Sequence, residues 1–100
     1  MLSPTSPELL TDPQGRPYFL WDCEMTLDEL RRALRDSEPA ARAYLVAKMM
    51  RQAKPDDVFS LVSVEEILEL WDRVEVQLGT MRPFWSWLLR RWAEQDREAG

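Results

Sequence analysis

Acidic side chains are the groups in this sequence that come closest to a catalytic arrangement. Asp56 and Asp57 are adjacent, and Glu65 precedes Glu69 by four residues, a spacing that puts both carboxylates on one face of a helix. Such pairs can act as a general acid and base or can bind a metal ion. More commonly, acids complement the positive end of a helix dipole or cover a solvated helix face. We therefore predict neither catalysis nor metal binding at these pairs.

Other catalytic signatures are missing from the composition. The chain of 100 residues has no histidine, which is the commonest general base and metal ligand. Its single cysteine, Cys23, has neither a histidine to activate it nor a second thiol for an intrachain disulfide. The three glycines, one of them terminal, do not form a phosphate-binding loop. The sequence thus predicts a protein that is not an enzyme and that needs no cofactor.

A group of basic residues in the first half of the chain raises the question of nucleic-acid binding. The group consists of Arg31, Arg32, Arg35, Arg42 and Lys48. Such charges usually form a solvated helix face, and the formal net charge of −5 has the opposite sign to that which favours phosphate contacts. We therefore do not expect nucleic acid as a partner, whereas an acidic surface suits a basic protein.

Tryptophan is the most informative residue type, because five tryptophans in 100 residues are many. This residue fills cores and is also enriched at the energetic centres of interfaces. Helical spacing assigns Trp71, Trp85 and Trp92 to the core. Trp87 instead points well away from the apolar face of its helix. We predict that Trp87 anchors a protein partner.

The elements that must position these residues are expected to be helices, because glycine and β-branched residues are few. A helix over residues 39–53 is apolar on two sides and is predicted to be the central one, packed from both sides. Tyr44 belongs to one of these apolar faces. Lys48 lies inside the same face, so its stem is expected to reach outward.

Local signals place the ends of the other helices. Thr26 and Ser63 each precede a glutamate by three residues, which is the capping-box spacing, and Ser37 can cap the central helix. A helix over residues 64–78 is expected to end at Gly79. Its apolar stripe is Val64, Ile67, Leu68, Trp71, Val74 and Leu78, opposite an acidic face of Glu65, Glu66, Glu69 and Asp72. A short helical turn over residues 56–62 and a last helix from residue 83 complete the set.

The predicted fold is all-α: a compact bundle of four main helices and one short helix, in which the first two form a HEAT-like pair. Residues 1–16, rich in proline, are predicted to be a flexible arm, and residues 17–100 a single helical domain. Tyr18, Phe19, Leu20 and Trp21 either cover the helices as a cap or stay partly exposed for a partner. No segment reads as a secretion signal or a membrane span, so we expect a cytoplasmic protein.

Four segments together resemble a bacterial family. They are Tyr18-Phe19-Leu20-Trp21-Asp22, Met25-Thr26-Leu27-Asp28-Glu29-Leu30, Arg42-Ala43-Tyr44-Leu45 and Met81-Arg82-Pro83-Phe84-Trp85-Ser86-Trp87-Leu88-Leu89. The order and type of these segments, over residues 17–92, resemble small helical proteins whose genes commonly adjoin nucleotidyltransferase-like toxins of the abortive-infection type.

The resemblance implies an antitoxin-like protein that binds such a toxin directly and blocks or distorts its nucleotide or RNA site. The predicted contacts are Trp87, the aromatic residues Tyr18, Phe19 and Trp21, and the acids Glu65, Glu66, Glu69 and Asp72. Two alternatives remain open. The chain can be a self-associating structural module, or a small transcriptional regulator, which would need a basic face.

Overall fold

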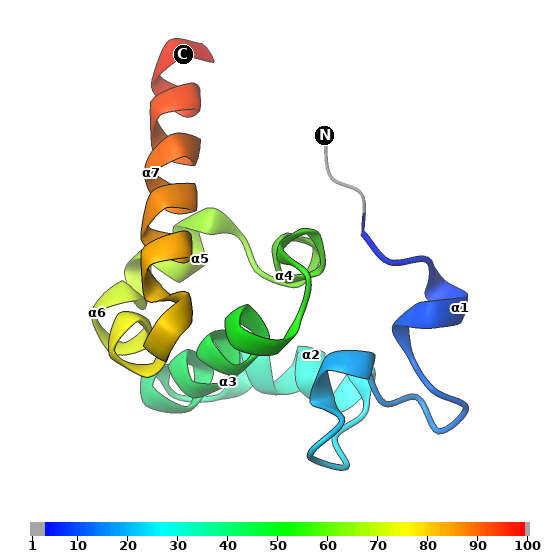
Figure 1. Cartoon of the computed structure of the whole chain (residues 1–100). Helices are drawn as coiled ribbons and strands as arrows, with labels where there is room; N and C mark the ends of the chain where they lie inside the picture. The colour runs from blue at the N-terminus through cyan, green and yellow to red at the C-terminus, as the bar shows by residue number, and fades with distance from the viewer. Residues whose placement is uncertain (1–3, 100) are drawn as a thin grey trace.

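The fold is all-α, as predicted, throughout the part of the chain that the computed structural model describes. This part comprises residues 4–99, with side chains described for residues 4–95 (Figure 1). Within it, the only bridge between extended residues joins Thr11 and Pro17. The elements in order are α1 (Pro7–Leu10), η1 (Tyr18–Leu20), α2 (Leu27–Asp36), α3 (Pro39–Gln52), α4 (Pro55–Leu61), α5 (Val64–Glu69), α6 (Trp71–Val74), η2 (Glu75–Gln77), η3 (Gly79–Met81) and α7 (Arg82–Ala99), where η denotes a 3₁₀ helix.

Helix α3 is the central element, which confirms the prediction for residues 39–53. It contacts η1, α2, α4, α6 and η2. Its buried residues are Ala43, Leu45, Val46, Ala47, Lys48, Met49 and Met50. The stem of Lys48 is buried, and its ammonium group donates to the Asp22 carboxylate at 2.7 Å. Tyr44 was predicted on an apolar face but is 51% exposed, because neighbouring elements leave that edge of α3 half uncovered.

The prediction of a single helix over residues 64–78 is wrong. Helix α5 ends at Glu69, Leu70 leaves the helical conformation with ψ near 3°, and α6 and η2 follow. This break buries Leu70, which the predicted stripe omitted, and leaves Leu68 50% exposed. Packing of Leu70 in the core thus outweighs the continuity of the helix. This break and the short helix α1 within the predicted arm together give seven α-helices among the described residues, rather than the predicted four main helices and one short helix.

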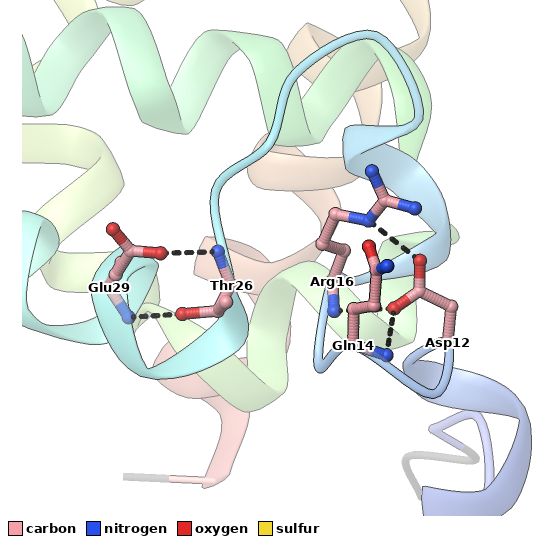
Figure 2. A network of polar contacts seen from close by, with 5 residues as sticks. All are labelled: Asp12, Gln14, Arg16, Thr26 and Glu29. Atoms are coloured by element: carbon pink, nitrogen blue, oxygen red, sulfur yellow. Dashed lines mark hydrogen bonds and ion pairs between the residues drawn. The ribbon is translucent and has the colours of Figure 1, made fainter.

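The helix caps agree with the sequence at three of the four predicted positions. Thr26 and Glu29 form a full capping box, with bonds of 3.0 and 3.2 Å (Figure 2). Ser63 caps α5 by accepting from the Glu66 amide at 3.1 Å, although the Glu66 carboxylate accepts from the Ser63 hydroxyl rather than from its amide. Gly79 has a positive φ of 56°, as a residue after a helix end requires.

The fourth predicted cap is wrong. Ser37 does not cap α3: it ends α2, and its amide bonds to the Ala33 carbonyl at 3.1 Å. Glu38 precedes α3 instead, without a side-chain bond to it.

Residues 4–16, the predicted arm, include a β-turn that is bonded to α2. The Gly15 amide donates to the Asp12 carbonyl at 2.9 Å across Pro13, which is the residue order of a type I turn. The Asp12 carboxylate accepts from the Gln14 amide and from both the amide and the guanidinium of Arg16 (Figure 2). The Gly15 carbonyl accepts from the Leu27 amide at 2.8 Å. The flexibility of the arm stays a prediction.

A buried carboxylate joins the arm to the helices. Asp57 of α4 is 1% exposed and accepts bonds from the amide and the hydroxyl of Thr5, at 2.7 and 2.6 Å, and from the Tyr18 hydroxyl at 2.6 Å. Burial disfavours the charged form, but these three donors outweigh it and hold the pKa of Asp57 below its usual value. Burial and the bond to Asp57 together raise the pKa of Tyr18.

Helix α7 is attached to α3 through Trp85. This side chain is fully buried, and its indole N–H donates to the Met50 carbonyl at 2.8 Å. The C-terminal half of α7 extends past the other helices (Figure 1). None of the helices in the described part of the chain has both the length and the apolar character needed to span a membrane.

Candidate protein-binding surface

Two neighbouring rows of apolar side chains run along α7. Trp85 and Leu89, four residues apart, form a buried row that faces the core. Phe84, Leu88 and Trp92 form a parallel row with the same spacing. This second row is only partly covered, since Phe84 is 38% exposed and Trp92 is 39% exposed. Helix α7 therefore presents large apolar groups both to the core and to its surroundings.

A pocket of about 390 Å³ separates the second row from α4. Its lining comprises Pro55, Asp56, Phe59, Phe84, Leu88, Trp92 and Gln95. An adjoining hollow of about 200 Å³ shares Phe59 and Trp92 with it, and Val62, Ser63, Val64 and Glu65 complete its lining. We call the two hollows together the α4–α7 groove. Its walls are mainly apolar, and each hollow has one carboxylate at its edge.

The groove takes its shape from aromatic contacts. Phe59 stacks on Trp92 with ring centroids 5.3 Å apart and an angle of 25° between the planes. The same ring meets the buried Trp85 edge-on at 5.7 Å. Because Trp85 is fixed to α3, these contacts hold the exposed Trp92 in a defined position.

Trp87 lies beside this groove and outside the core, as predicted, and 53% of it is exposed. Its ring lies 6.4 Å from that of Phe84, which lines the groove. The Arg91 guanidinium lies 5.7 Å from the Trp87 ring centroid, where a cation interacts favourably with the ring. We call Phe84, Trp87, Leu88 and Trp92, together with Phe59, the α7 aromatic surface.

The N-terminal aromatic residues that were predicted as partner contacts lie elsewhere. Phe19 is fully buried, so the prediction that it contacts a partner is wrong: its ring fills the core beneath η1. Tyr18 is partly exposed, but its hydroxyl is engaged with Asp57 and with the Lys54 amide. Trp21 is 76% exposed. The segment that contains Trp21 lies on the opposite side of the molecule from α7 (Figure 1).

The four predicted acidic contacts are all exposed, but the structure does not gather them around the aromatic surface. They are Glu65, Glu66, Glu69 and Asp72. Only Glu65 lines the α4–α7 groove. Glu66 lines a separate hollow with arginines of α2 and α3. The break at Leu70 places Asp72 on α6, a different helix from the three glutamates.

The sequence prediction missed the groove because it assigned Trp92 to the core. That assignment is wrong: Trp92 extends beyond the body of the core and packs on Phe59 of the short helix α4. A signal for this outcome was present. The apolar face of α7 spans about 140° of arc, which is wider than the stripe of about 100° that faces a core. The excess is the second row.

The described residues give no sign of a metal centre, since no three histidine, cysteine or carboxylate side chains among them lie close enough together to hold an ion. Comparisons of the chain with models of protein families, with curated proteins and with solved structures find no match.

Proposed function

We propose that this chain is a non-enzymatic protein-binding module and that its partner docks on the α7 aromatic surface. The observation that carries the proposal is the exposure of three large rings on one helix: Phe84 at 38%, Trp87 at 53% and Trp92 at 39%. Phe84 and Trp92 line an apolar groove, and Trp87 lies beside it. Clusters of this kind on a soluble domain are typical of interfaces, and tryptophan is prominent among interface anchors.

The charges around the groove define the chemistry of the partner. Asp56 and Glu65 line its two hollows, and the chain as a whole has a net charge of −5. A complementary partner presents an apolar side chain flanked by lysine or arginine. Such a pair is attracted over a distance and associates faster at low salt.

We further propose, on the basis of the family resemblance, that this partner is a nucleotidyltransferase-type toxin in the cytoplasm, which the chain neutralises by direct binding. A protein that handles RNA and nucleoside triphosphates needs a basic cleft, and an acidic helical partner is drawn toward such a cleft. In this proposal α2 and α3 form a HEAT-like pair that supports the binding helix.

A second function, self-association, is favoured by one specific feature of α7. The row Phe84, Leu88, Trp92 has an aromatic ring on either side of a leucine. Two copies of α7 that cross antiparallel at Leu88 would each place Phe84 against Trp92 of the other, as a two-fold interface requires. The chain would then be a structural module that forms dimers.

The test is affinity capture of host proteins with three tagged versions of the chain: wild type, Trp87→Ala and Trp21→Ala. Trp21 is the matched control, because it is the more exposed tryptophan but lies away from α7. We expect wild type and Trp21→Ala to retain a stoichiometric nucleotidyltransferase-like protein and Trp87→Ala to lose most of it. A different protein lost in the same way would support the binding surface and overturn the toxin proposal.

Sedimentation velocity of the purified chain separates the two functions. A monomer at micromolar concentration is the result expected for a module that binds a different protein. A dimer that Leu88→Glu converts to a monomer would instead establish self-association through α7.

In the capture experiment, equal recovery of host protein by Trp87→Ala and by wild type would overturn the proposed surface.

A further inference from the structure

A further hollow, of about 320 Å³, is lined mainly by arginine. It lies among α2, α3, α4 and α5, and we call it the arginine pocket. Its lining comprises Arg31, Leu34 and Arg35 of α2, Arg42 of α3, Leu61 of α4 and Glu66 of α5. These arginines belong to the basic group that the sequence presents in its first half. Lys48 of that group is instead buried and paired with Asp22.

The pocket has an excess of positive charge. Three guanidinium groups face one carboxylate, that of Glu66. Arg35 has an ion pair with Asp36 at 3.1 Å, but that pair is mostly exposed and therefore weak. No ion pair among the described side chains joins Glu66 to an arginine. Glu66 is bonded to the Ser63 hydroxyl at 3.3 Å.

Arg42 makes this excess energetically significant. Its Nε atom is buried and has no acceptor, and it is the only such side-chain nitrogen or oxygen found among the described residues. Burying a charged donor without an acceptor is unfavourable, and natural structures rarely leave such a group unsatisfied. An anion held in the hollow would neutralise the excess charge and so lower the cost of this buried charged donor.

We propose that the arginine pocket binds the phosphoryl group of a small phosphate monoester. The planar guanidinium matches the oxygens of a phosphoryl group and can donate two parallel bonds to it. A monoester has a charge of about −1.5 to −2 at neutral pH, which balances three arginines and one glutamate better than a single carboxylate would. Leu34 and Leu61 supply an apolar wall for the organic part of the ligand.

The site is distinct from the α7 aromatic surface, because the two share no residue. The proposal does not depend on the protein-binding function. A polyanion such as RNA is a poorer match than a small molecule, since the net charge of −5 opposes a long phosphate chain outside the pocket.

The experiment is a titration of the ¹⁵N-labelled chain with phenyl phosphate, followed through the Nε–H signals of its arginines. We expect a saturable shift of the Arg42 signal. Benzoate, which has the same ring but a single charge, should bind with an affinity that is lower than that of phenyl phosphate by roughly tenfold or more. Inorganic phosphate is the third probe. If inorganic phosphate binds more weakly than phenyl phosphate, the leucine wall contributes to binding. If the two bind equally, the pocket is a site for the free ion.

Matched variants complete the test. Arg42→Gln should weaken the binding of phenyl phosphate by roughly tenfold or more. Arg32→Gln, on α2 but outside the lining of the pocket, should leave the affinity unchanged. Glu66→Gln should tighten binding because it removes a like charge. If Arg42→Gln does not fold, Arg31→Gln takes its place. A shift that does not saturate, or equal affinity in Arg42→Gln and wild type, would overturn the proposal.

Discussion

The Tyr18 hydroxyl donates a 2.6 Å hydrogen bond to the carboxylate of Asp57, across 39 positions of sequence. The Tyr18 oxygen in turn accepts from the Lys54 amide at 2.8 Å, at the start of α4. Thr5 donates two further bonds to the same carboxylate. One buried acid therefore connects the N-terminal segment, η1 and α4. Removal of a single hydroxyl group at this site is therefore expected to lower the free energy of unfolding.

The two tyrosines of the chain provide a matched pair of variants. Tyr18→Phe removes the hydroxyl that bonds to Asp57, and we expect it to lower the free energy of unfolding by about 1.5–3 kcal/mol, as is typical of a bond to a charged group. Tyr44→Phe should change it by less than about 0.5 kcal/mol, since Tyr44 is 51% exposed and its hydroxyl makes no hydrogen bond with the residues that the structure describes. Urea denaturation followed by circular dichroism measures both. Equal losses would contradict the role of the Tyr18–Asp57 bond.

The contribution of Asp57 is predicted to depend on pH. Its folded-state pKa is lowered, because the bonds from Thr5 and Tyr18 outweigh the opposing effect of burial. In the unfolded chain the carboxyl group titrates at about 3.9. The stabilisation is therefore complete above that pH and is lost as the pH falls toward the folded-state pKa, because the unfolded chain takes up the proton first.

Comparison with Asp57→Asn isolates this effect. At pH 7 the variant should have a lower urea midpoint than the wild type, and the difference between the two should shrink as the pH is lowered from 5 to 3. Denaturation curves at several pH values check this. A difference that stays constant over this range would show that the charge of Asp57 is not what stabilises the fold.

Trp85 and Trp87 are two positions apart and are predicted to respond in opposite ways to truncation. Trp85→Ala removes a fully buried ring and its bond to Met50, so we expect a loss of about 3–5 kcal/mol in unfolding free energy. Trp87→Ala should cost less than about 1 kcal/mol of stability but about 2 kcal/mol or more of binding to the captured partner. Thermal denaturation and calorimetric titration measure the two effects. Unfolding of Trp87→Ala would place this residue in the core and contradict its role as an anchor.

The ion pair of Lys48 and Asp22 is predicted to affect the stability of the fold mainly when only one of its two charges is removed. The bond to Asp22 raises the pKa of Lys48, whose side chain is only 10% exposed. Asp22→Asn should therefore lower the urea midpoint, because it leaves the buried charge without its counter-ion. Adding Lys48→Met should restore much of the loss by replacing the charge with an apolar side chain of similar length. A double variant that is no more stable than Asp22→Asn would contradict this explanation.

Local patterns in the sequence were sufficient for the helical class, for the positions of α2, α3 and α7, and for the caps at Thr26, Ser63 and Gly79. A cap, a proline at the first turn or a glycine at a helix end acts on residues within about four positions of itself. The amphipathic spacing of α3 likewise predicted its burial from two sides. Trp87 could be placed outside the core for the same reason, since its direction follows from the helical repeat alone.

Tertiary contacts decided the features that those patterns missed. The helix break at Leu70, the burial of Phe19 and the half-exposed row of Phe84 and Trp92 depend on which elements lie next to them. The arginine pocket is formed by residues of four helices, so no single helical repeat reveals it. Direction around a helix is a local property, whereas burial and charge balance depend on neighbours that are distant in sequence, such as Met50 for Trp85 and Asp57 for Tyr18.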